Sequence, residues 1–488
     1  MACSFEDIVS ELELAGLIFD VANSSAVEVF GAACNSREVA PGNIFVCKGR
    51  SFKPAYLDDA LAKGAVAVVC DSAVEVEIPA DIPAIITSDI RPVQAVVSKV
   101  AWGKPDERLT IVGVTGTQGK TTTTTFVKAA IEACTNTKCG FIGTHLVFDG
   151  AETSEPPNTT PEPPDLYRYL NAMVQNGATN CVMEISSQGL KYDRVYGLDV
   201  NVAAITNIGI DHIAPIEHPS VEDYVATKFR IAEVSKTVVV NKNLALLPEV
   251  VELAAKGMQE LEQNGDVEIV KCSGEHFTAK LKLPGAYNKE NAACALEICK
   301  CLGLDVQKSV EAICDVSVEG RMEVSVSKDG KLVGIVDYAH TKNAFVKFFN
   351  AIHAEYPGAF IITYFGCSAG KAIDRQVGLP QVAGAESDYV VVTSDEPFGE
   401  DPQEFAEKIA GNLPTGTEHC VIANRDEACD FAFAKAAEIL SKGTAEKCVV
   451  CALAKGAEDV CPCSTGDIPI IPDTKHVPMK IAEYDEQL

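Results

Sequence analysis

Short apolar runs alternate with amphipathic segments along most of the chain. "GNIFVCKG" (42–49) predicts a strand after a Pro-Gly turn, and "AYLDDALAKGAVAVVC" (55–70) predicts a helix that leads into a strand. The same alternation resumes at "LTIVGVTG" (109–116) and again after "EGRMEV" (319–324). Strands and helices that alternate in this way form parallel sheets covered by helices, so the pattern predicts an α/β fold.

Two interruptions divide the pattern. "WGKPDER" (102–108) has the composition of a linker, and the second interruption is the segment just before residue 323. A length of 488 residues accommodates about three domains of the usual size. We therefore predict domains at residues 1–107, 108–322 and 323–488.

Charge narrows the choice of partners. The formal net charge is −28, without a basic stripe to offset it, which argues against a nucleic-acid partner. Glu6, Asp7 and Glu11 interrupt the start of the chain, and no apolar stretch approaches the ~20 residues of a membrane span. We predict a cytoplasmic protein without membrane insertion that acts as a monomer.

The chain has 19 cysteines, which is unusual for a protein of this kind. Cys448, Cys451, Cys461 and Cys463 lie close enough in sequence to raise the possibility of a zinc site. However, "KCVVCALAKG" (447–456) has the pattern of a buried strand, whose alternation directs Cys448 and Cys451 to opposite faces. We predict buried free thiols there and not a zinc site.

A glycine-containing turn follows the strand at residues 109–115. Its residues Gly116, Gly119, Lys120 and Thr121 have the types that a phosphate-binding loop needs. Glycines let backbone N–H groups approach phosphate oxygens, the lysine neutralises phosphate charge, and the threonine hydroxyl is a ligand for Mg²⁺. The usual loop opens with a glycine where this chain has Val114, so an ordinary glycine turn is the alternative. The strand, lysine and threonine together favour phosphate binding.

A phosphate loop alone is compatible with a kinase, a motor or a GTPase. Glu184 ends a second apolar strand, "ATNCVMEISS" (178–187), where a further Mg²⁺ ligand is expected. His212 follows a third strand, and Lys228 lies in a predicted helix without an acid at its i±4 positions. Taken singly, these are compatible with a surface acid, a loop histidine and a solvated lysine. Their order and spacing favour one site.

The motifs along the chain together resemble those of the Mur ligase family of ATP-dependent amide-bond-forming enzymes. They are "NSREVAPGNIFVCKG" (35–49), "TGTQGKTTT" (115–123), "NTTPE" (158–162), "MEISS" (183–187), "TNIGIDHI" (206–213), "YVATK" (224–228), "YNKENAACA" (287–295), "GRME" (320–323), "VDYAHT" (336–341), "FGCS" (365–368), "SDEP" (394–397) and "AKGAED" (454–459). The resemblance implies an N-terminal nucleotide-sugar-binding domain, a central P-loop ATPase-type parallel sheet and a C-terminal Rossmann-like domain.

The resemblance also implies roles for individual residues. Lys120, Glu184, His212 and Lys228 would be catalytic. Thr121, Glu184, His212 and Lys228 would hold two Mg²⁺ ions, with Lys228 carbamylated on its side-chain nitrogen. The ATP contacts would be Gly116, Thr117, Gly119, Lys120, Thr121, Thr122, Asn207, Asn291, Arg321, Asp337 and His340. The substrate contacts would be Ser36, Thr159, Thr160, Ser186, Arg194, Arg375, Asp395, Glu396, Gly456 and Glu458.

Within the family, the motifs resemble the branch that adds the third residue of the peptidoglycan stem peptide. The implied partners are UDP-MurNAc-L-Ala-D-Glu and a free amino acid. In that chemistry the D-glutamate carboxylate attacks the ATP γ-phosphoryl group, and the amine then displaces phosphate from the resulting acyl phosphate. A folylpolyglutamate or cyanophycin synthetase is an alternative, which the "NTTPE" and "SREV" motifs disfavour. A noncatalytic ATP-binding paralogue that regulates cell-wall synthesis is another.

Several positions depart from the family pattern. Gln188 and Ala457 replace histidines, and Asp395-Glu396-Pro397-Phe398 replaces an aspartate-asparagine-proline-arginine signature. In the family, the arginine of that signature binds the second carboxylate of meso-diaminopimelate, and phenylalanine has no donor for it.

The acids of this segment indicate which amino acid is added. We expect Asp395, Glu396, Glu400 and Asp401 to repel a carboxylate, with surface exposure screening part of their charge. We therefore predict L-lysine or ornithine as the amino acid, over meso-diaminopimelate. The alternative is a carboxylate clamp formed by Arg375 and Lys371.

Overall fold

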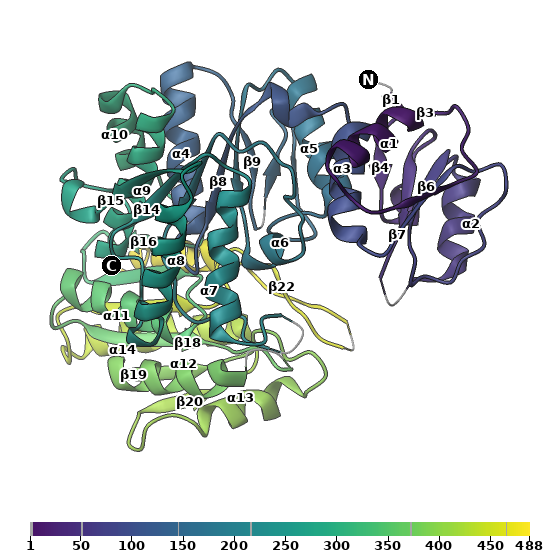
Figure 1. Ribbon diagram of the computed structural model, residues 1–488. Coiled ribbons are helices and arrows are strands. Elements are labelled where there is room, and N and C mark those ends of the chain that lie inside the picture. The colour runs from purple at the N-terminus through teal and green to yellow at the C-terminus, as the bar shows by residue number, and fades with distance from the viewer. Residues whose placement is uncertain (1–2, 50–51, 145, 215–216, 371–372, 465) are drawn as a thin grey trace. The chain divides into compact units, whose positions relative to one another are not determined.

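The computed structural model describes residues 3–49, 52–144, 146–214, 217–370, 373–464 and 466–488. The chain forms two compact units. The first contains Met1–Ala279 and Glu290–Ile313, and the second contains Lys280–Lys289 and Cys314–Leu488. Both are built of parallel strands and covering helices, which confirms the predicted α/β fold (Figure 1). The domain boundaries drawn from the sequence stay predictions.

The N-terminal part of the first unit is a five-stranded sheet in the order β2-β7-β6-β5-β4, with β2 antiparallel to its neighbour. Its strands are β2 (Asp20–Ala22), β4 (Ala32–Ala33), β5 (Ile44–Cys47), β6 (Ala67–Asp71) and β7 (Ala84–Thr87), its helices are α1 (Phe5–Leu14), α2 (Pro54–Ala62) and α3 (Ile90–Ala101), and β1 (Cys3–Ser4) pairs with β3 (Glu28–Val29) beside them. Alternate residues of β5 supply two cores. Ile44 and Val46 pack with α1 and α3, while Phe45 and Cys47 pack with α2.

The rest of the first unit is an eight-stranded sheet in the order β11-β10-β9-β12-β8-β13-β14-β15, parallel from β9 to β15. Its strands are β8 (Thr110–Thr115), β9 (Gly140–Ile142), β10 (Val147–Phe148), β11 (Thr153–Ser154), β12 (Asn180–Glu184), β13 (Val202–Ile205), β14 (Thr237–Asn241) and β15 (Glu268–Cys272). Its helices are α4 (Lys120–Thr135), α5 (Pro163–Gln175), α6 (Ser187–Lys191), α7 (Val221–Phe229) and α8 (Val251–Gln263), followed by α9 (Ala286–Cys301) and α10 (Val306–Asp315). The carboxyl ends of β8, β12 and β13 meet at one edge, which carries the first group of candidate residues.

The second unit is a six-stranded sheet in the order β16-β17-β21-β18-β19-β20, in which only β16 is antiparallel to its neighbour among the described strands. Its strands are β16 (Glu323–Val326), β17 (Leu332–Asp337), β18 (Phe360–Phe365), β19 (Tyr389–Val392), β20 (His419–Val421) and β21 (Cys448–Leu453), and β22 (Val460–Cys461) pairs with β23 (Ile468–Pro469) in a separate hairpin. Its helices are α11 (Lys342–Glu355), α12 (Ile373–Glu386), α13 (Pro402–Ala410), α14 (Arg425–Ser441) and α15 (Asp473–Asp485).

The cysteines are mostly part of these cores. All 19 cysteines lie within the described residues and carry free thiols. Cys301 is the one that is exposed. The segment at 448–453 forms the buried strand β21, as predicted, and Cys448 packs with Val450 and Ala452 on one face of it. Burial raises the pKa of the Cys448 thiol to about 12. These thiols therefore contribute apolar volume in the protonated form.

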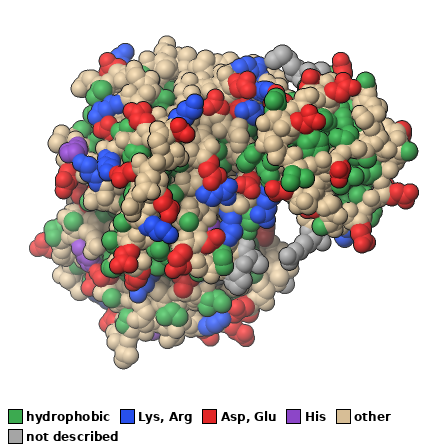
Figure 2. Space-filling model, in the orientation of Figure 1, with side chains coloured by type: hydrophobic (Ala, Val, Ile, Leu, Met, Phe, Trp, Pro, Cys, Tyr) green, Lys and Arg blue, Asp and Glu red, His purple; other side chains and the backbone are tan. Residues whose placement is uncertain are grey.

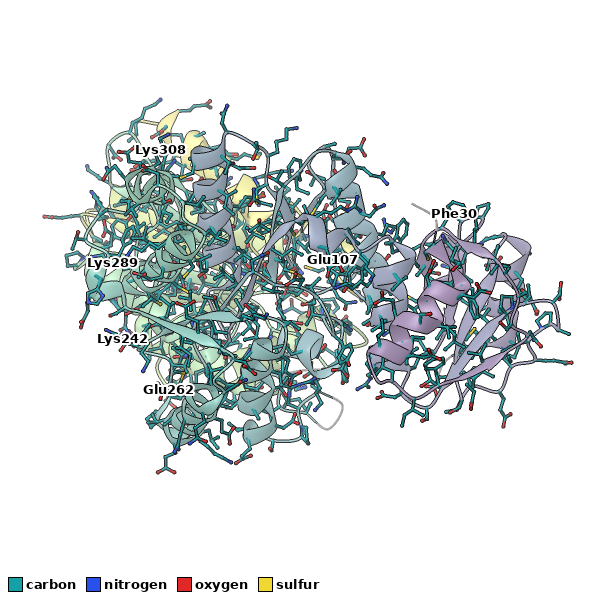
Figure 3. The ribbon with its side chains drawn as sticks, turned by 45° about the horizontal axis from the view of Figure 1, so that its top comes forward. Phe30, Glu107, Lys242, Glu262, Lys289 and Lys308 are labelled. Carbon is teal, nitrogen blue, oxygen red and sulfur yellow. The ribbon has the colours of Figure 1, made fainter. Side chains whose placement is uncertain are left out.

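The surface is highly charged. Figure 2 shows acidic side chains spread among lysines and arginines over the face that it displays. Exposed ion pairs of this surface include Glu262 of α8 with Lys271 of β15 at 2.8 Å, and Glu262 is labelled in Figure 3. Such pairs contribute little to stability because water and salt screen them. In the part of the chain that the structure describes, no helix is long and apolar enough to cross a membrane.

Candidate active site

The phosphate-loop candidate joins β8 to α4. Gly116 has φ +152° and Gly119 has φ +82°. A Cβ atom on Gly116 would lie 1.9 Å from Thr206 Oγ1, and one on Gly119 would lie 2.3 Å from Asn291 Oδ1. Both positions therefore require glycine for reasons of space as well as backbone conformation. Asn291 of α9 therefore lies next to the loop.

Asn207, after β13, shapes this loop. Its Oδ1 accepts from Gln118 N at 2.9 Å, its Nδ2 donates to Gln118 O at 2.9 Å, and its carbonyl accepts from Thr117 N at 3.0 Å. Thr206 Oγ1 also donates to Gln118 O, at 2.7 Å. Asn207 was predicted as an ATP contact, and in the structure its amide holds the loop that would contact ATP.

Helix α4 begins with Lys120 and the threonines that follow it. Lys120 Nζ donates to Gly116 O at 2.9 Å, so the ammonium lies over the loop. Thr124 and Thr125 donate their hydroxyls to Lys120 O (2.9 Å) and Thr121 O (2.8 Å), one turn earlier in the helix. Such bonds allow β-branched residues in a first helical turn. Thr122 is buried.

A buried carboxylate faces the start of α4. Glu184, at the end of β12, is 1% exposed. Its Oε1 accepts from Thr121 Oγ1 at 3.0 Å and from Thr144 N at 3.2 Å, and its Oε2 accepts from Thr144 Oγ1 at 3.1 Å. A carboxylate surrounded by hydroxyl oxygens has the ligand chemistry that Mg²⁺ prefers. Thr144 was not identified from the sequence, because it follows a short strand and belongs to no recognised motif.

Lys228 lies on α7 and is 1% exposed, so it is not the solvated lysine of the alternative interpretation. Its Nζ lies 4.5 Å from the centre of the Tyr224 ring, and the Tyr224 hydroxyl is 3.0 Å from Thr117 Oγ1 in the phosphate loop. Burial, reinforced by the charge of Lys120, holds the pKa of Lys228 well below its usual value. The side chain is therefore an amine that favours its neutral form.

His212 stands at the left-handed backbone position φ +57° after β13. Its Nδ1 lies 3.0 Å from Glu217 Oε1, and its side chain is 44% exposed. Gln188 Nε2 donates to the same Glu217 oxygen at 2.7 Å. Gln188 replaces a family histidine, and here it shares an acceptor with the predicted ligand His212.

The substrate candidates of the first unit form a second cluster beside Glu184. Thr160 Oγ1 donates to Glu184 O at 3.1 Å and accepts from Ser186 N at 2.9 Å, and Thr159 Oγ1 donates to Thr144 Oγ1 at 3.3 Å. Arg194 Nη1 donates to Thr160 O at 3.1 Å. The hydrogen bonds of this cluster thus bring together four of the five substrate residues predicted in the first unit.

Ser36 is the fifth. It lies in a short 3₁₀ helix of the N-terminal sheet region, and its carbonyl accepts from Lys63 Nζ at 2.8 Å. Between the two regions, Glu162 pairs with Arg194 at 2.7 Å and also with Lys48. Glu162 and Lys48 were not predicted as site residues, because neither motif that contains them indicates that their side chains meet.

The nucleotide candidates of the second unit meet at the end of β17. Asp337 accepts from Met322 N and Ala339 N, both at 2.8 Å, and burial raises its pKa although Arg321 opposes the shift. The Arg321 guanidinium lies 4.7 Å from the centre of the Tyr338 ring, and His340 Nδ1 lies 2.7 Å from Tyr338 O. Arg321, Asp337 and His340 are therefore neighbours.

The amino-acid candidates surround the turn after β21. Lys455 Nζ lies 3.1 Å from Asp395 Oδ1 and 2.5 Å from Glu458 Oε2, and Ser368 Oγ donates to Glu396 Oε2 at 2.5 Å. Gly456 packs against the Tyr338 ring. Lys455 was missed, because a lysine within a motif gives no sign from sequence that its side chain is buried.

The expectation of an acidic surface segment at 395–401 was wrong in part. The Asp395 side chain is 10% exposed and paired with Lys455, so solvent does not screen it as expected. Asp401 accepts from Gln403 N and Glu404 N as the cap of α13, and Glu400 pairs with Lys408 at 3.5 Å. With Glu396 bonded to Ser368, each of the four acids has a partner within the fold. Arg375 lies on α12, while Lys371, its partner in the alternative clamp, is outside the described residues.

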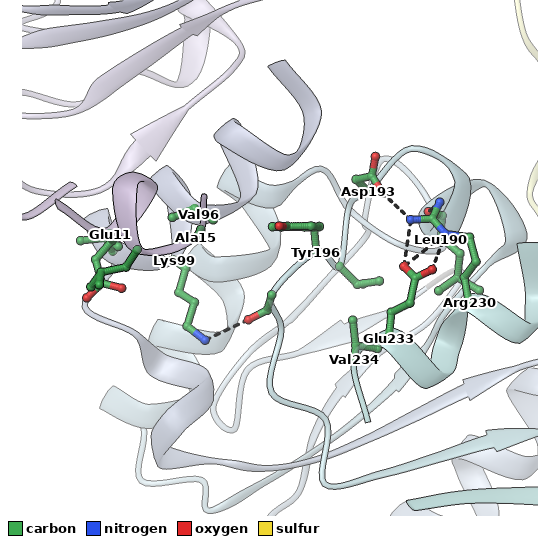
Figure 4. A pocket seen from close by; sticks show the side chains of 14 residues that line it. Glu11, Ala15, Val96, Lys99, Leu190, Asp193, Tyr196, Arg230, Glu233 and Val234 are labelled. Atoms are coloured by element: carbon green, nitrogen blue, oxygen red, sulfur yellow. Dashed lines mark hydrogen bonds and ion pairs between the residues drawn. The ribbon is translucent and has the colours of Figure 1, made fainter. Parts of the chain in front are cut away.

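A separate pocket of about 460 Å³ lies within the first unit (Figure 4). Its charged side chains are satisfied within the fold, since Arg230 pairs with Asp193 at 2.7 Å and Glu233 at 3.0 Å, and Lys99 donates to Gly197 O at 2.9 Å. None of the residues predicted for the active site lines this pocket. It is distinct from the clusters described above.

Comparisons with known proteins agree on the family of this chain. Residues 114–299 match the Mur ligase middle domain, and residues 320–450 match the Mur ligase glutamate ligase domain. The chain is 32% identical over 454 residues to UDP-N-acetylmuramoyl-L-alanyl-D-glutamate--L-lysine ligase of Enterococcus faecalis, covering 88% of this chain and 87% of that protein.

Solved structures share the fold. A UDP-N-acetylmuramoyl-L-alanyl-D-glutamate--2,6-diaminopimelate ligase aligns with a TM-score of 0.62 at 23% identity, over 100% of this chain and 99% of the other. The MurF ligase of Thermotoga maritima in complex with ADP aligns with a TM-score of 0.56 at 18% identity, over 94% and 97% of the two chains. The length and identity of the match to the Enterococcus relative settle the family: this chain belongs to the Mur ligases, ATP-dependent enzymes that form amide bonds.

Proposed function

We propose that this enzyme adds L-lysine to the D-glutamate of UDP-MurNAc-L-Ala-D-Glu, using ATP, in the synthesis of peptidoglycan precursors. The observation that carries the proposal is the match over 88% of the chain to a relative whose name specifies this reaction. The arrangement of acids around Lys455, together with Phe398, supports the choice of amino acid. We further propose that the enzyme acts as a monomer in the cytoplasm.

The phosphate side of the reaction would lie at the edge formed by β8, β12 and β13. Lys120 would leave the carbonyl of Gly116 to neutralise the γ-phosphoryl group, and the backbone N–H groups of the loop would hold the other phosphates. Thr121 and Glu184 would hold one Mg²⁺, since their oxygens already lie 3.0 Å apart. A bound Mg²⁺ supplies charge stabilisation for phosphoryl transfer.

Lys228 would act as a carbamate. A buried amine with a lowered pKa is neutral, and a neutral amine can attack the carbon of CO₂ with loss of one proton. The product is a carboxylate on a side chain that began as a cation. That group, with His212, has the oxygen and nitrogen donors that a second Mg²⁺ would take.

The substrate carboxylate would be presented by the cluster at Thr159, Thr160, Ser186 and Arg194. Attack of that carboxylate on the γ-phosphorus breaks the bond to ADP and forms an acyl phosphate. The α-amine of the incoming amino acid then attacks the acyl carbon, and inorganic phosphate leaves. Glu162, which pairs with both Arg194 and Lys48, holds two cations in the region where an anionic substrate would bind.

Residues of the second unit would recognise the side chain of the incoming amino acid. Phe398 provides no donor for a distal carboxylate. Asp395 and Glu458 provide negative charge for a distal ammonium, and the Tyr338 hydroxyl donates to Glu458 Oε1 at 2.6 Å. Use of meso-diaminopimelate, with Arg375 binding its second carboxylate, is the alternative substrate choice.

Phosphate release tests the proposal directly. The enzyme, ATP, Mg²⁺ and UDP-MurNAc-L-Ala-D-Glu are incubated with one amino acid at a time, and the product mass is measured in parallel. We expect release that requires L-lysine and a product heavier by one lysine residue. Release with meso-diaminopimelate but not with lysine would overturn the substrate choice, and no ligation with any diamino acid would overturn the proposed function.

A further inference from the structure

Lys455 is a buried cation between two carboxylates. It follows β21, and its side chain is 0% exposed. Its Nζ lies 3.1 Å from Asp395 Oδ1 and 2.5 Å from Glu458 Oε2. Burial alone would lower the pKa of Lys455, but the two carboxylates raise it above its usual value, so the side chain is an ammonium.

The backbone around Lys455 is unusual. Ala454 has φ +82° and Gly456 has φ +60°, so two left-handed positions flank the lysine. An alanine in this conformation is sterically unfavourable and persists only when its surroundings enforce it. Ala454 N donates to Asp337 O at 3.2 Å, and Glu458 N donates to Lys455 O at 3.2 Å. These contacts fix the turn that carries both Lys455 and Glu458.

Glu458 is held at both of its oxygens. One pairs with Lys455, and the other accepts from the Tyr338 hydroxyl at 2.6 Å. Its side chain is still 27% exposed, so a carboxylate with a fixed direction faces solvent. The strongest influence on the pKa of Asp395 is burial, which raises it, while Lys455 and Arg425 oppose that shift. Lys455 therefore favours the ionised form of one acid and the orientation of the other.

The charges of this group do not cancel. Asp395 and Glu458 contribute two negative charges and Lys455 one positive charge. Arg425, the other cation acting on Asp395, is already paired with Asp473 at 3.1 and 2.6 Å. Glu396, next in sequence to Asp395, accepts from the neutral hydroxyl of Ser368 and so adds a further negative charge. A net negative charge around a fixed carboxylate suits a ligand that brings an ammonium.

We propose that Lys455 is a positioning residue for the amino-acid substrate: by holding Asp395 and Glu458, it sets the direction and the net charge of the surface that receives a single side-chain ammonium. This inference rests on the proposed function and deepens it. Lys455 itself does not touch the substrate. It acts through Glu458, because it orients the part of the Glu458 carboxylate that is exposed to solvent.

The test compares Lys455→Met with Lys455→Arg, and with Lys442→Met as a matched control on an exposed ion pair. We expect Lys455→Met to raise the KM for L-lysine about tenfold or more, because Glu458 is no longer oriented toward the side-chain ammonium of the substrate. The KM for ATP should change little. We expect its KM for lysine to rise further as the pH falls, because Asp395 without Lys455 takes up a proton more readily. Lys455→Arg should recover part of the loss, and Lys442→Met should behave as the wild type does.

A double variant covers the case in which Lys455→Met does not fold. Lys455→Met with Asp395→Asn removes a buried charge pair together, which proteins commonly tolerate. It also restores the net charge, but Glu458 still lacks its partner, so the KM for lysine should stay raised. A KM within about twofold of the wild type in either variant, across about pH 6.5 to 8.5, would overturn the inference while leaving lysine as the substrate. If the wild type uses another amino acid, the proposed substrate is wrong, and the same comparison made with that amino acid still decides the role of Lys455.

Discussion

Two lysines of the proposed reaction centres, Lys120 and Lys455, are held in contrasting ways. Lys120 is partly exposed and donates to the carbonyl of Gly116, a neutral acceptor. Lys455 is fully buried between two carboxylates. A cation bonded to a carbonyl can exchange that partner for a phosphate at small cost, whereas one between buried carboxylates cannot leave without exposing their charge. The first is suited to meeting a ligand, and the second to shaping the place where a ligand binds.

The largest effect should come from Lys120→Ala. The γ-phosphoryl group would lose a major electrostatic contact, so we expect kcat to fall about 100-fold or more. Lys128→Ala, farther along the same helix, is the control, because Lys128 pairs with Glu132 at 2.8 Å. Steady-state phosphate release measures both, and turnover of Lys120→Ala near the wild-type rate would contradict the assignment of the phosphate loop.

Lys228→Ala should have an effect of similar size, also about 100-fold, but one that can be reversed. If the working group is a carbamate, a short carboxylic acid in the assay buffer can occupy the space left by the side chain. We expect acetate or propionate to restore part of the activity of Lys228→Ala and to leave Lys120→Ala inactive. A fully active enzyme whose Lys228 shows no added CO₂ by ¹³C NMR would argue decisively against this chemistry.

Substrate choice should respond more modestly. The wild type should prefer L-lysine to meso-diaminopimelate in kcat/KM, and Phe398→Arg should shift that ratio toward meso-diaminopimelate by about tenfold, because guanidinium can bind a distal carboxylate in a bidentate pair. Phe398 already has φ +48°, so arginine meets no new backbone restriction there. If the ratio is unchanged in Phe398→Arg, residues other than Phe398 recognise the distal group of the amino acid. Arg375 would then be the next residue to test.

The smallest effect should come from Thr144→Val. It removes the hydroxyl that donates to Glu184 Oε2 at 3.1 Å but keeps the backbone bond from Thr144 N. We expect the KM for Mg²⁺ to rise about five- to tenfold with little change in the KM for lysine, since one hydrogen bond to a charged group is lost. Thr153→Val, on the exposed strand β11, provides the control. Equal behaviour of the two variants would remove Thr144 from the site.

The phosphate loop and the cluster around Lys455 also differ in how far each could be predicted from the sequence. The phosphate loop could be predicted because its chemistry is local: Gly116, Lys120 and Thr121 lie within six residues, and a strand leads into them. The α/β order was predictable for the same reason, since β8, β12 and β21 are continuous apolar runs.

The amino-acid candidates of the second unit depend on contacts between distant segments. Asp395 and Lys455 are 60 positions apart, and Tyr338 and Glu458 are 120 apart. A single sequence gives no sign of which acid will find a buried cation. For that reason Asp395 was expected at the surface, and Thr144, Glu162 and Lys455 went unnoticed. Site residues were therefore easiest to predict where they lie close together along the backbone. They were hardest to predict where two side chains from distant segments form the contact.

The buried thiols have a practical consequence for the experiments that follow. Maleimides and iodoacetamide react with accessible thiolates, and most cysteines of this chain are neither accessible nor easily ionised, with the pKa of Cys299 at about 12, for instance. Cys301 is the one that the described residues leave exposed, and it ends α9, the helix that also carries Asn291. Burial and nearby acids raise the pKa of the Cys301 thiol as well, so exposure is what distinguishes it. A dye on Cys301 would place a reporter on the helix beside the phosphate loop, and the six partly exposed cysteines are the competing sites to remove.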